Sequence, residues 1–266
     1  MIILQNEKPK RPIRAVLFDF DGTISTLRSG WEEVMRSMML EMIAGDAPVT
    51  DSLRNEVDAY IDASTGIQTI FQMQWLCQYI KTYGTKKDMP EDPWWYKDIY
   101  NERLMQVVDK RKAALASNTA QREQFLIAGS DTLLEAFRRK GLELYVASGT
   151  DDEDVTAEVG ILGLKHYFSR IAGAGYRSLQ CSKERTLRDL LKKSGYEGEE
   201  LLIMGDGKVE IALGREIGAW TIGAATDESL RRGLNPAKQG RLKSAGAHVI
   251  IGDYLDTEEI IGWMGI

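Results

Sequence analysis

The chain has 266 residues, of which 43% are hydrophobic and 28% are charged, a composition typical of a globular protein. Its formal net charge of −6 argues against broad nucleic-acid binding, which depends on a basic surface. No apolar run approaches the roughly 20 residues that a membrane span needs, and the first residues lack the apolar core of a signal peptide. The two cysteines, Cys77 and Cys181, are too few for a disulfide framework or a structural zinc site, so a cytoplasmic location is expected.

Five short apolar segments predict strands. They are rich in Val, Ile, Leu and aromatic residues and lack polar alternation, as strands do when both faces of a parallel sheet are buried. In chain order they are Ile13–Phe20, Leu142–Ala147, Leu201–Met204, Trp220–Ala224 and His248–Ile251. Helical patterns lie between the later strands, at Ser130–Lys140, Ser182–Ser194 and Lys208–Ile217. This alternation predicts an α/β fold with a doubly wound, parallel, Rossmann-like sheet.

The segment between the first two predicted strands breaks this rhythm and reads as helices only. The expected helices are Trp31–Ile43, Asp51–Ala63, Gln68–Thr82 and Pro93–Ala116. The segment holds four of the six Trp and seven of the ten Met, which we assign to packing inside a helical bundle rather than to a ligand. We therefore expect an α/β core formed by residues 1–24 and 129–266, with an all-helical domain, residues 25–128, inserted into it.

Two carboxylates follow the first predicted strand, in the sequence Asp19-Phe20-Asp21-Gly22-Thr23. Open α/β sheets bind ligands at this end of their strands. One carboxylate can attack as a nucleophile while the other donates and later accepts a proton. Two like charges also need a cation, and hard oxygen ligands suit Mg²⁺. A strand-end turn with solvated acids is the alternative, because Asp and Gly favour turns.

Three further patterns lie downstream. Ser148 and Gly149 follow the second predicted strand, where a hydroxyl and backbone N–H groups can bind phosphate oxygens. Lys183 stands near a helix start and can neutralise a phosphate and an attacking carboxylate together, although Arg185 and Arg188 are nearby competitors and a surface lysine is usually only solvated. Asp206 follows the third predicted strand and would complete a magnesium site, with Glu210 close behind it.

Together and in this order, the four patterns resemble the signature motifs of the haloacid dehalogenase superfamily of phosphohydrolases. The helical insert stands where members of the phosphoglycolate phosphatase and β-phosphoglucomutase branch carry a helical cap domain. The family usually has Asp at the position of Glu210, so direct contact of this residue with a metal, or contact through water, is left open.

The resemblance implies a magnesium-dependent phosphatase that hydrolyses a small phosphorylated metabolite through an aspartyl-phosphate intermediate. Asp19 would attack phosphorus, and Asp21 would protonate the leaving oxygen and then activate water. Because halide leaves without a proton, Asp21 also favours phosphate esters over carbon–halogen bonds. The implied catalytic residues are Asp19, Asp21 and Lys183; the implied phosphate-binding residues are Ser148, Gly149, Lys183 and Phe20; the implied metal-binding residues are Asp19, Asp21, Asp206 and Glu210.

Substrate selection is expected from the cap. The loop Ser64–Gln68 has the small and polar residues of a contact loop, with Thr65, Gly66 and Gln68 as candidates, although an ordinary inter-helix turn would look the same. Arg28, on the expected hinge, is a candidate for contact with an anionic substrate. The acidic run Asp151–Asp154 is assigned to the start of a helix rather than to a second metal site.

Three rival functions stay open at this point: a sugar phosphomutase of the same fold, a phosphonate hydrolase and a catalytically idle binding module. A phosphonate hydrolase would need a cap lysine that forms an imine; the candidates are Lys81, Lys86 and Lys87. None of the three has an apolar setting that would lower its pKa. The intact set of motif residues argues against a binding module. The identity of the substrate and the oligomeric state are not determined by the sequence.

Overall fold

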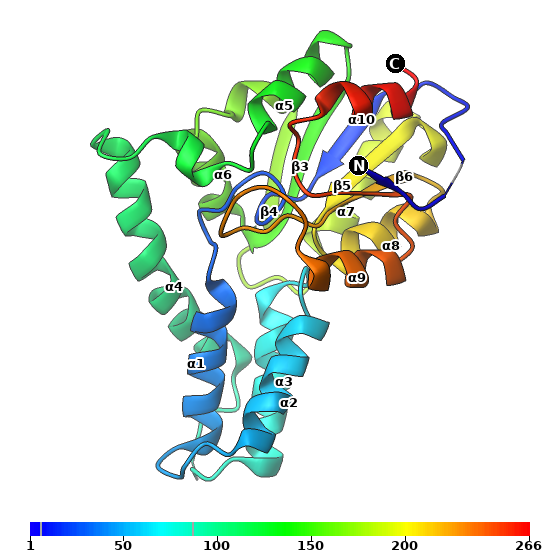
Figure 1. The fold of residues 1–266 in the computed structure, drawn as a ribbon. Coiled ribbons are helices and arrows are strands. Elements are labelled where there is room, and N and C mark those ends of the chain that lie inside the picture. The colour runs from blue at the N-terminus through cyan, green and yellow to red at the C-terminus, as the bar shows by residue number, and fades with distance from the viewer. Residues whose placement is uncertain (6, 87) are drawn as a thin grey trace.

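The computed structural model describes residues 1–5, 7–86 and 88–266. Within them, seven strands form one sheet in the order β1-β7-β6-β5-β2-β3-β4 (Figure 1). The strands are β1 (Ile2–Ile3), β2 (Ala15–Phe18), β3 (Glu143–Asp151), β4 (Arg170–Ala174), β5 (Leu201–Gly205), β6 (Trp220–Ala224) and β7 (Val249–Ile251). Every neighbouring pair is parallel except β1 and β7. The predicted doubly wound α/β fold is confirmed.

The strand β2 is an interior strand, which lies between β5 and β3. Val16 is paired with Leu144 on one side and with Leu202 on the other. Because these strands run in the same direction, the residues that follow them meet at one edge of the sheet. The strand β3 continues beyond the predicted end at Ala147 to Asp151, with a shift of register against β4 in between.

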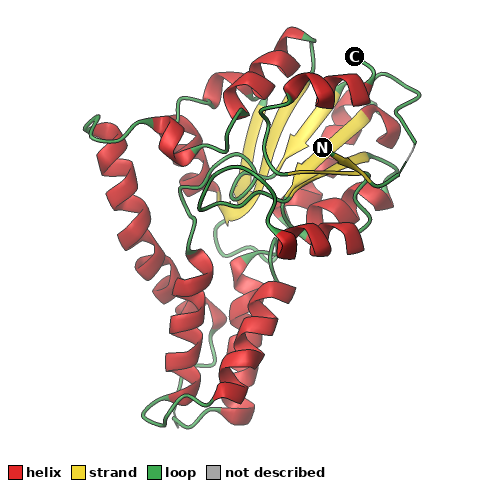
Figure 2. Cartoon of the chain, viewed as in Figure 1, coloured by secondary structure: helices red, strands yellow, loops and turns green. Residues whose placement is uncertain are grey.

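Helices cover both faces of the sheet (Figure 2). In β2, Val16 and Phe18 belong to one hydrophobic cluster, whereas Ala15 and Leu17 belong to the cluster on the other face. The helices are α5 (Ser130–Arg139), α6 (Asp152–Ile161), α7 (Ser182–Ser194), α8 (Lys208–Glu216), α9 (Pro236–Ser244) and α10 (Thr257–Met264), with short 3₁₀ turns at Arg122–Phe125, Lys165–Tyr167 and Gly198–Glu200. Burial of both faces explains the continuous apolar runs of the central strands.

The elements without a sequence prediction are β1, β4, α9 and α10. The strand β1 has two residues, and β4 has the sequence Arg-Ile-Ala-Gly-Ala, so neither carries a clear apolar run. Both are edge strands, where one side needs no partner. The helix α6 begins at Asp152, in agreement with the assignment of the acidic run to a helix start.

Among the described residues, four α-helices lie in the chain between β2 and α5: α1 (Trp31–Ala44), α2 (Asp51–Ala63), α3 (Thr69–Tyr83) and α4 (Pro93–Ala116). They project from the sheet as a bundle (Figure 1). The bundle has a hydrophobic cluster of its own, in which Met35, Met38, Met39 and Met73 are fully buried. The methionine-rich composition therefore serves packing, as expected. No helix in the described ranges is long and apolar enough to cross a lipid bilayer.

Two of these helices begin with side-chain caps that the sequence specifies. The hydroxyl of Thr50 accepts a hydrogen bond from the backbone N–H of Leu53 at the start of α2. The carboxylate of Asp92 accepts one from the N–H of Trp94 at the start of α4, where Pro93 takes the first helical position. Such caps satisfy N–H groups that have no partner within the helix.

Candidate active site

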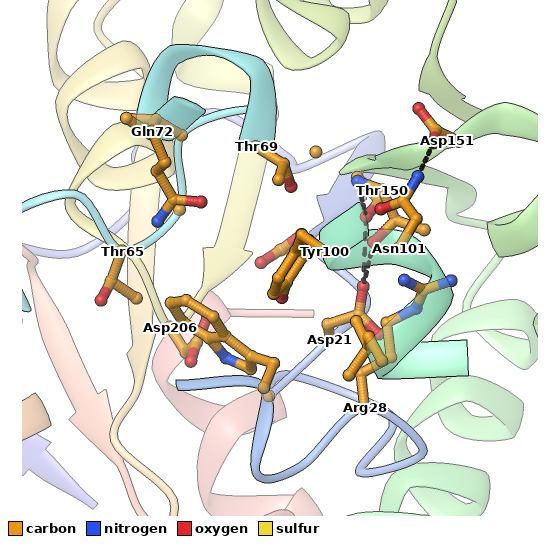
Figure 3. A pocket seen from close by; sticks show the side chains of 18 of the residues that line it. Asp21, Arg28, Thr65, Thr69, Gln72, Tyr100, Asn101, Thr150, Asp151 and Asp206 are labelled. Atoms are coloured by element: carbon orange, nitrogen blue, oxygen red, sulfur yellow. Dashed lines mark hydrogen bonds between the residues drawn. The ribbon is translucent and has the colours of Figure 1, made fainter. Parts of the chain in front are cut away.

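One pocket at the carboxyl edge of the sheet collects the chemistry-bearing residues. It is lined by Asp19, Asp21, Ser148, Lys183 and Asp206, which come from four separate stretches of the chain (Figure 3). The parallel register of β2, β3 and β5 brings these stretches together, and α7 adds the lysine from beside β3. The other side of the pocket is formed by the helical insert.

Asp19 lies directly after β2 and is 5% exposed. Its backbone N–H donates to the carbonyl of Met204 at 2.8 Å, which fixes the chain at the strand end. Its Oδ1 lies 3.2 Å from Nζ of Lys183. Burial raises the pKa of Asp19 to about 7, with Lys183 opposing the shift and Asp206 and Asp21 adding to it. A cation in this site would therefore favour the charged form of Asp19.

Asp21 presents two oxygens in different states. Oδ2 accepts hydrogen bonds from Oγ1 of Thr150 at 2.8 Å and from Oγ of Ser148 at 3.3 Å (Figure 3). Oδ1 is buried and has no hydrogen-bond partner among the described residues. One oxygen is thus anchored by β3, while the other makes no hydrogen bond within the described part of the chain.

Gly22 allows the sharp turn after Asp21. Its φ is +72°, a left-handed conformation, and a Cβ at this position would lie 2.4 Å from Oδ2 of Asp206. The turn therefore packs against Asp206, the residue that follows β5. This close approach needs a residue without a side chain.

Lys183 lies in the first turn of α7 and is 3% exposed. Its ammonium group contacts Asp19, forms an ion pair with Glu210 and donates to the carbonyl of Gly66 at 3.2 Å. A single cation thus joins two carboxylates of the core to the loop between α2 and α3. Glu210 is held against Lys183, so its carboxylate is engaged by a lysine in this structure.

The fit of the site to Mg²⁺ rests on a small donor set. Among the described residues, no group of three or more His, Cys, Asp or Glu side chains is placed to hold a metal. The available side-chain ligands are the carboxylates of Asp19 and Asp206. The charge of Asp206 contributes to the raised pKa of Asp19. Magnesium keeps several waters and is commonly bound through one or two carboxylates, so this set suits Mg²⁺.

Sequence reasoning missed a buried network behind Asp206. Nζ of Lys238, from α9, lies 2.6 Å from Oδ2 of Asp206 and 2.5 Å from Oε1 of Glu228. Burial alone would lower the pKa of Lys238, but the two carboxylates raise it above its ordinary value. Burial also raises the pKa of Glu228 to about 7, although Lys238 opposes the shift. The sequence shows no motif at Lys238, and the helix that carries it, α9, was not predicted.

A second missed group lies on the helical insert. Lys97 and Asn101, one turn apart on α4, both contact Asp151 at the end of β3; Figure 3 shows Asn101 and Asp151. Nζ of Lys97 lies 2.7 Å from Oδ1 and 2.5 Å from Oδ2, and Nδ2 of Asn101 lies 3.0 Å from Oδ2. Together with Tyr100 and Leu104 they form the face of α4 that lines the pocket. Their helical spacing was the available signal.

Arg28 is buried and lines the pocket, but its charge is already matched. Its Nη2 lies 2.7 Å from Oε1 of Glu158 and 3.1 Å from Oδ2 of Asp154, both on α6. Burial and the nearby Asp21 raise the pKa of Glu158 to about 7, with Arg28 opposing the shift. Arg28 therefore links the segment between β2 and α1 to α6.

The remaining candidates are placed as follows. Thr65, Gly66 and Gly149 line the pocket. Gln68 instead donates to the carbonyl of Gln180 at 3.1 Å, and the side chain of Phe20 lies in the hydrophobic core, which leaves only its backbone for a ligand. Lys81 and Lys86 do not line the pocket. Lys81 pairs with Glu91, and Lys86 pairs with Asp46. Lys87 lies outside the described residues.

The sequence pattern of the haloacid dehalogenase-like hydrolase family matches residues 13–218, more than half of the chain. No curated protein sequence matches the chain significantly. Solved structures share the fold over nearly the whole chain. A predicted phosphoglycolate phosphatase from Haemophilus somnus 129pt is 18% identical, with a TM-score of 0.62 over 94% of this chain and 99% of that one.

Two further structures extend the likeness. A β-phosphoglucomutase from Clostridium difficile is 15% identical, with a TM-score of 0.66 over 95% of this chain and 97% of that one. CbbY from Rhodobacter sphaeroides, solved in complex with phosphate, is 19% identical, with a TM-score of 0.60 over 92% and 96%. At such identities the likeness shows the fold, whereas the family match covers both the strand of Asp19 and the segment of Asp206. The chain belongs to the haloacid dehalogenase-like hydrolase family.

Proposed function

We propose that the protein is a magnesium-dependent phosphatase that hydrolyses a small phosphorylated metabolite through an aspartyl-phosphate on Asp19. The observation that carries this proposal is the state of Asp21, whose Oδ1 is buried and has no hydrogen-bond partner among the described residues, two positions after the buried Asp19. An alkoxide leaving group needs a proton and a halide does not, so an acid in this position favours phosphate esters.

In the proposed reaction, the carboxylate of Asp19 attacks phosphorus, and the bond to the leaving oxygen breaks as Asp21 protonates that oxygen. Asp21 then takes a proton from water as the water attacks phosphorus, which releases phosphate and regenerates Asp19. Lys183 and Ser148 stabilise the charge of the transferring group. Mg²⁺, held by Asp19, Asp206 and the backbone carbonyl of Asp21, would supply charge neutralisation when bound.

We further propose that residues 25–128 act as a cap on a core made of residues 1–24 and 129–266. The contact between Lys183 and the carbonyl of Gly66 supports this role, because it closes the cap loop onto the reacting groups. Closure would exclude water until a substrate is bound. Cys77 and Cys181 are both free thiols, in line with a cytoplasmic setting.

The test is hydrolysis of a generic aryl phosphate with Mg²⁺, with EDTA in its place, and with the Asp19→Asn variant. We expect EDTA to abolish turnover and Asp19→Asn to lower it by about 10³-fold or more, because an amide is not a nucleophile here. Asp98→Asn, at an exposed position on α4, is the matched control and should retain full activity. Hydrolysis that survives metal removal or Asp19→Asn would contradict the mechanism.

The same preparation separates the alternatives. Isomerisation of a hexose 1-phosphate without phosphate release would favour the phosphomutase. A lack of turnover on the aryl phosphate and on a broad panel of phosphorylated metabolites would favour the binding module.

A further inference from the structure

In the proposed reaction, the leaving group would occupy the part of the pocket next to Asp21. Asp21 is the proposed proton donor to the leaving oxygen, and its Oδ2 is held by Thr150. The next residue along β3 is Asp151, and 32% of its side chain is exposed in the pocket mouth. Asp21, Thr150 and Asp151 line the same pocket, so the groups around Asp151 are candidates for contact with the leaving group.

Besides Lys183, the cations that line the pocket are Arg28 and Lys97. Each is already paired with carboxylates. Arg28 bonds to Glu158 and Asp154, and Lys97 bonds to both oxygens of Asp151. Among the described residues, this part of the pocket therefore has no unpaired cation for a second anionic group.

The remaining lining groups suit hydroxyls. The carboxylate of Asp151 accepts hydrogen bonds, the amide of Asn101 donates and accepts, and Thr69 and Gln72 add further polar atoms from α3 (Figure 3). The rings of Trp31 and Tyr100 border the same space. Acceptors and donors beside aromatic rings can bind a molecule that carries several hydroxyls on an apolar ring.

We infer that the leaving group is an uncharged polyhydroxylated alcohol of the sugar class, recognised through its hydroxyls by Asp151 and Asn101, with Lys97 holding Asp151 in position. This inference rests on the proposed phosphatase function and narrows it. A substrate with a carboxylate or a second phosphate would place its charge next to Asp151 without a free cation, which costs desolvation and adds repulsion.

The experiment compares kcat/KM for a panel of aldose and ketose monophosphates with that for 2-phosphoglycolate and fructose 1,6-bisphosphate. The wild type should favour the best sugar monophosphate over both acidic compounds by about tenfold or more, since unpaired buried charge is strongly rejected. Asp151→Asn leaves Lys97 without its carboxylate. The preference should then shrink by about tenfold, as the freed cation attracts the acidic substrates.

Asp98→Asn is the matched control, since Asp98 follows Lys97 on α4 but is largely exposed and pairs with Arg177 instead. It should leave the preference unchanged. A wild type that favours the acidic compounds, or a preference that Asp151→Asn leaves unaltered, would overturn the inference.

Binding of the same compounds to the Asp19→Asn protein, measured by isothermal titration calorimetry, tests the preference without turnover. Tighter binding of the acidic compounds would overturn the inference as well. Failure of the aryl phosphate assay alone would contradict the proposed phosphatase, whereas an inverted preference with intact aryl phosphate turnover would contradict only the sugar-like leaving group.

Discussion

At the residue scale, Asp206 is a buried carboxylate that would also have to bind a cation in the proposed function. Lys238 solves part of this problem, since it binds Oδ2 of Asp206 and also Glu228. Two buried carboxylates that share one ammonium group form a network in which each member depends on the others. Removal of one member leaves an uncompensated buried charge, and this lowers the stability of the fold by more than the intact ion pair adds to it.

Lys238→Met is therefore expected to lower the free energy of unfolding by about 3 kcal/mol, as measured by urea denaturation, because Asp206 and Glu228 lose their cation. Lys243→Met, at an exposed position on the same helix, should change it by less than about 0.5 kcal/mol. Adding Glu228→Gln to Lys238→Met should restore part of the loss, because one buried charge disappears. Equal effects of the two lysine substitutions would contradict the network.

At the element scale, the loop between α2 and α3 packs directly against the core. Gly66 has a φ of +90°, and a Cβ at this position would lie 3.2 Å from Cα of Gly207 and 3.3 Å from Oε2 of Glu210. Its carbonyl accepts the hydrogen bond from Lys183. The loop therefore sets how near the insert can approach the carboxyl edge of the sheet.

Gly66→Ala should lower kcat/KM for the aryl phosphate by about tenfold, because the added methyl group pushes the loop away from the core and misplaces the groups it contacts. Gly195→Ala is the matched control, since Gly195 also has a left-handed φ, of +69°, with no atom within 4 Å of its added Cβ. Both variants should lose about 1 kcal/mol of stability through backbone strain. Similar kinetics for the two variants would show that close packing of this loop is not required.

At the scale of the whole molecule, global stability is linked to protonation of His248, which lies between β6 and β7. Its Nδ1 accepts a hydrogen bond from the backbone N–H of Thr221 at 3.1 Å and lies 2.8 Å from Oγ1 of the same residue. Burial, aided by Arg215, lowers the pKa of His248 to about 4. The folded protein therefore holds this ring neutral at a pH where the unfolded chain would protonate it.

This difference predicts acid destabilisation in a defined range. The folded pKa lies below the unfolded value of about 6.5, so the contribution is fully present above pH 6.5 and is lost as the pH falls towards 4. The free energy of unfolding should fall by about 2 kcal/mol over that range on account of His248. His248→Asn keeps an acceptor for Thr221 and should remove this part of the pH dependence. Parallel stability profiles for the two proteins would exclude the linkage.

The apolar strands and the starts and ends of several helices could be predicted from the sequence, because they depend on local chemistry. The helices Asp51–Ala63, Pro93–Ala116 and Ser182–Ser194 have the predicted bounds, each with a start or stop that the chain itself specifies. The edge strand β4 was not readable, because an edge strand with small residues is defined by its neighbour rather than by its own pattern.

For the site, the sequence by itself determined that Asp19, Asp21, Ser148, Lys183 and Asp206 would meet, because each follows a strand or begins a helix on the same edge of a parallel sheet. Only the tertiary structure decided which charges neutralise one another. Lys238 forms an ion pair with Asp206, and Lys97 of the insert forms an ion pair with Asp151 of the core. Such pairs join residues far apart in the chain, so no local pattern specifies them, and they follow from the packing of whole elements.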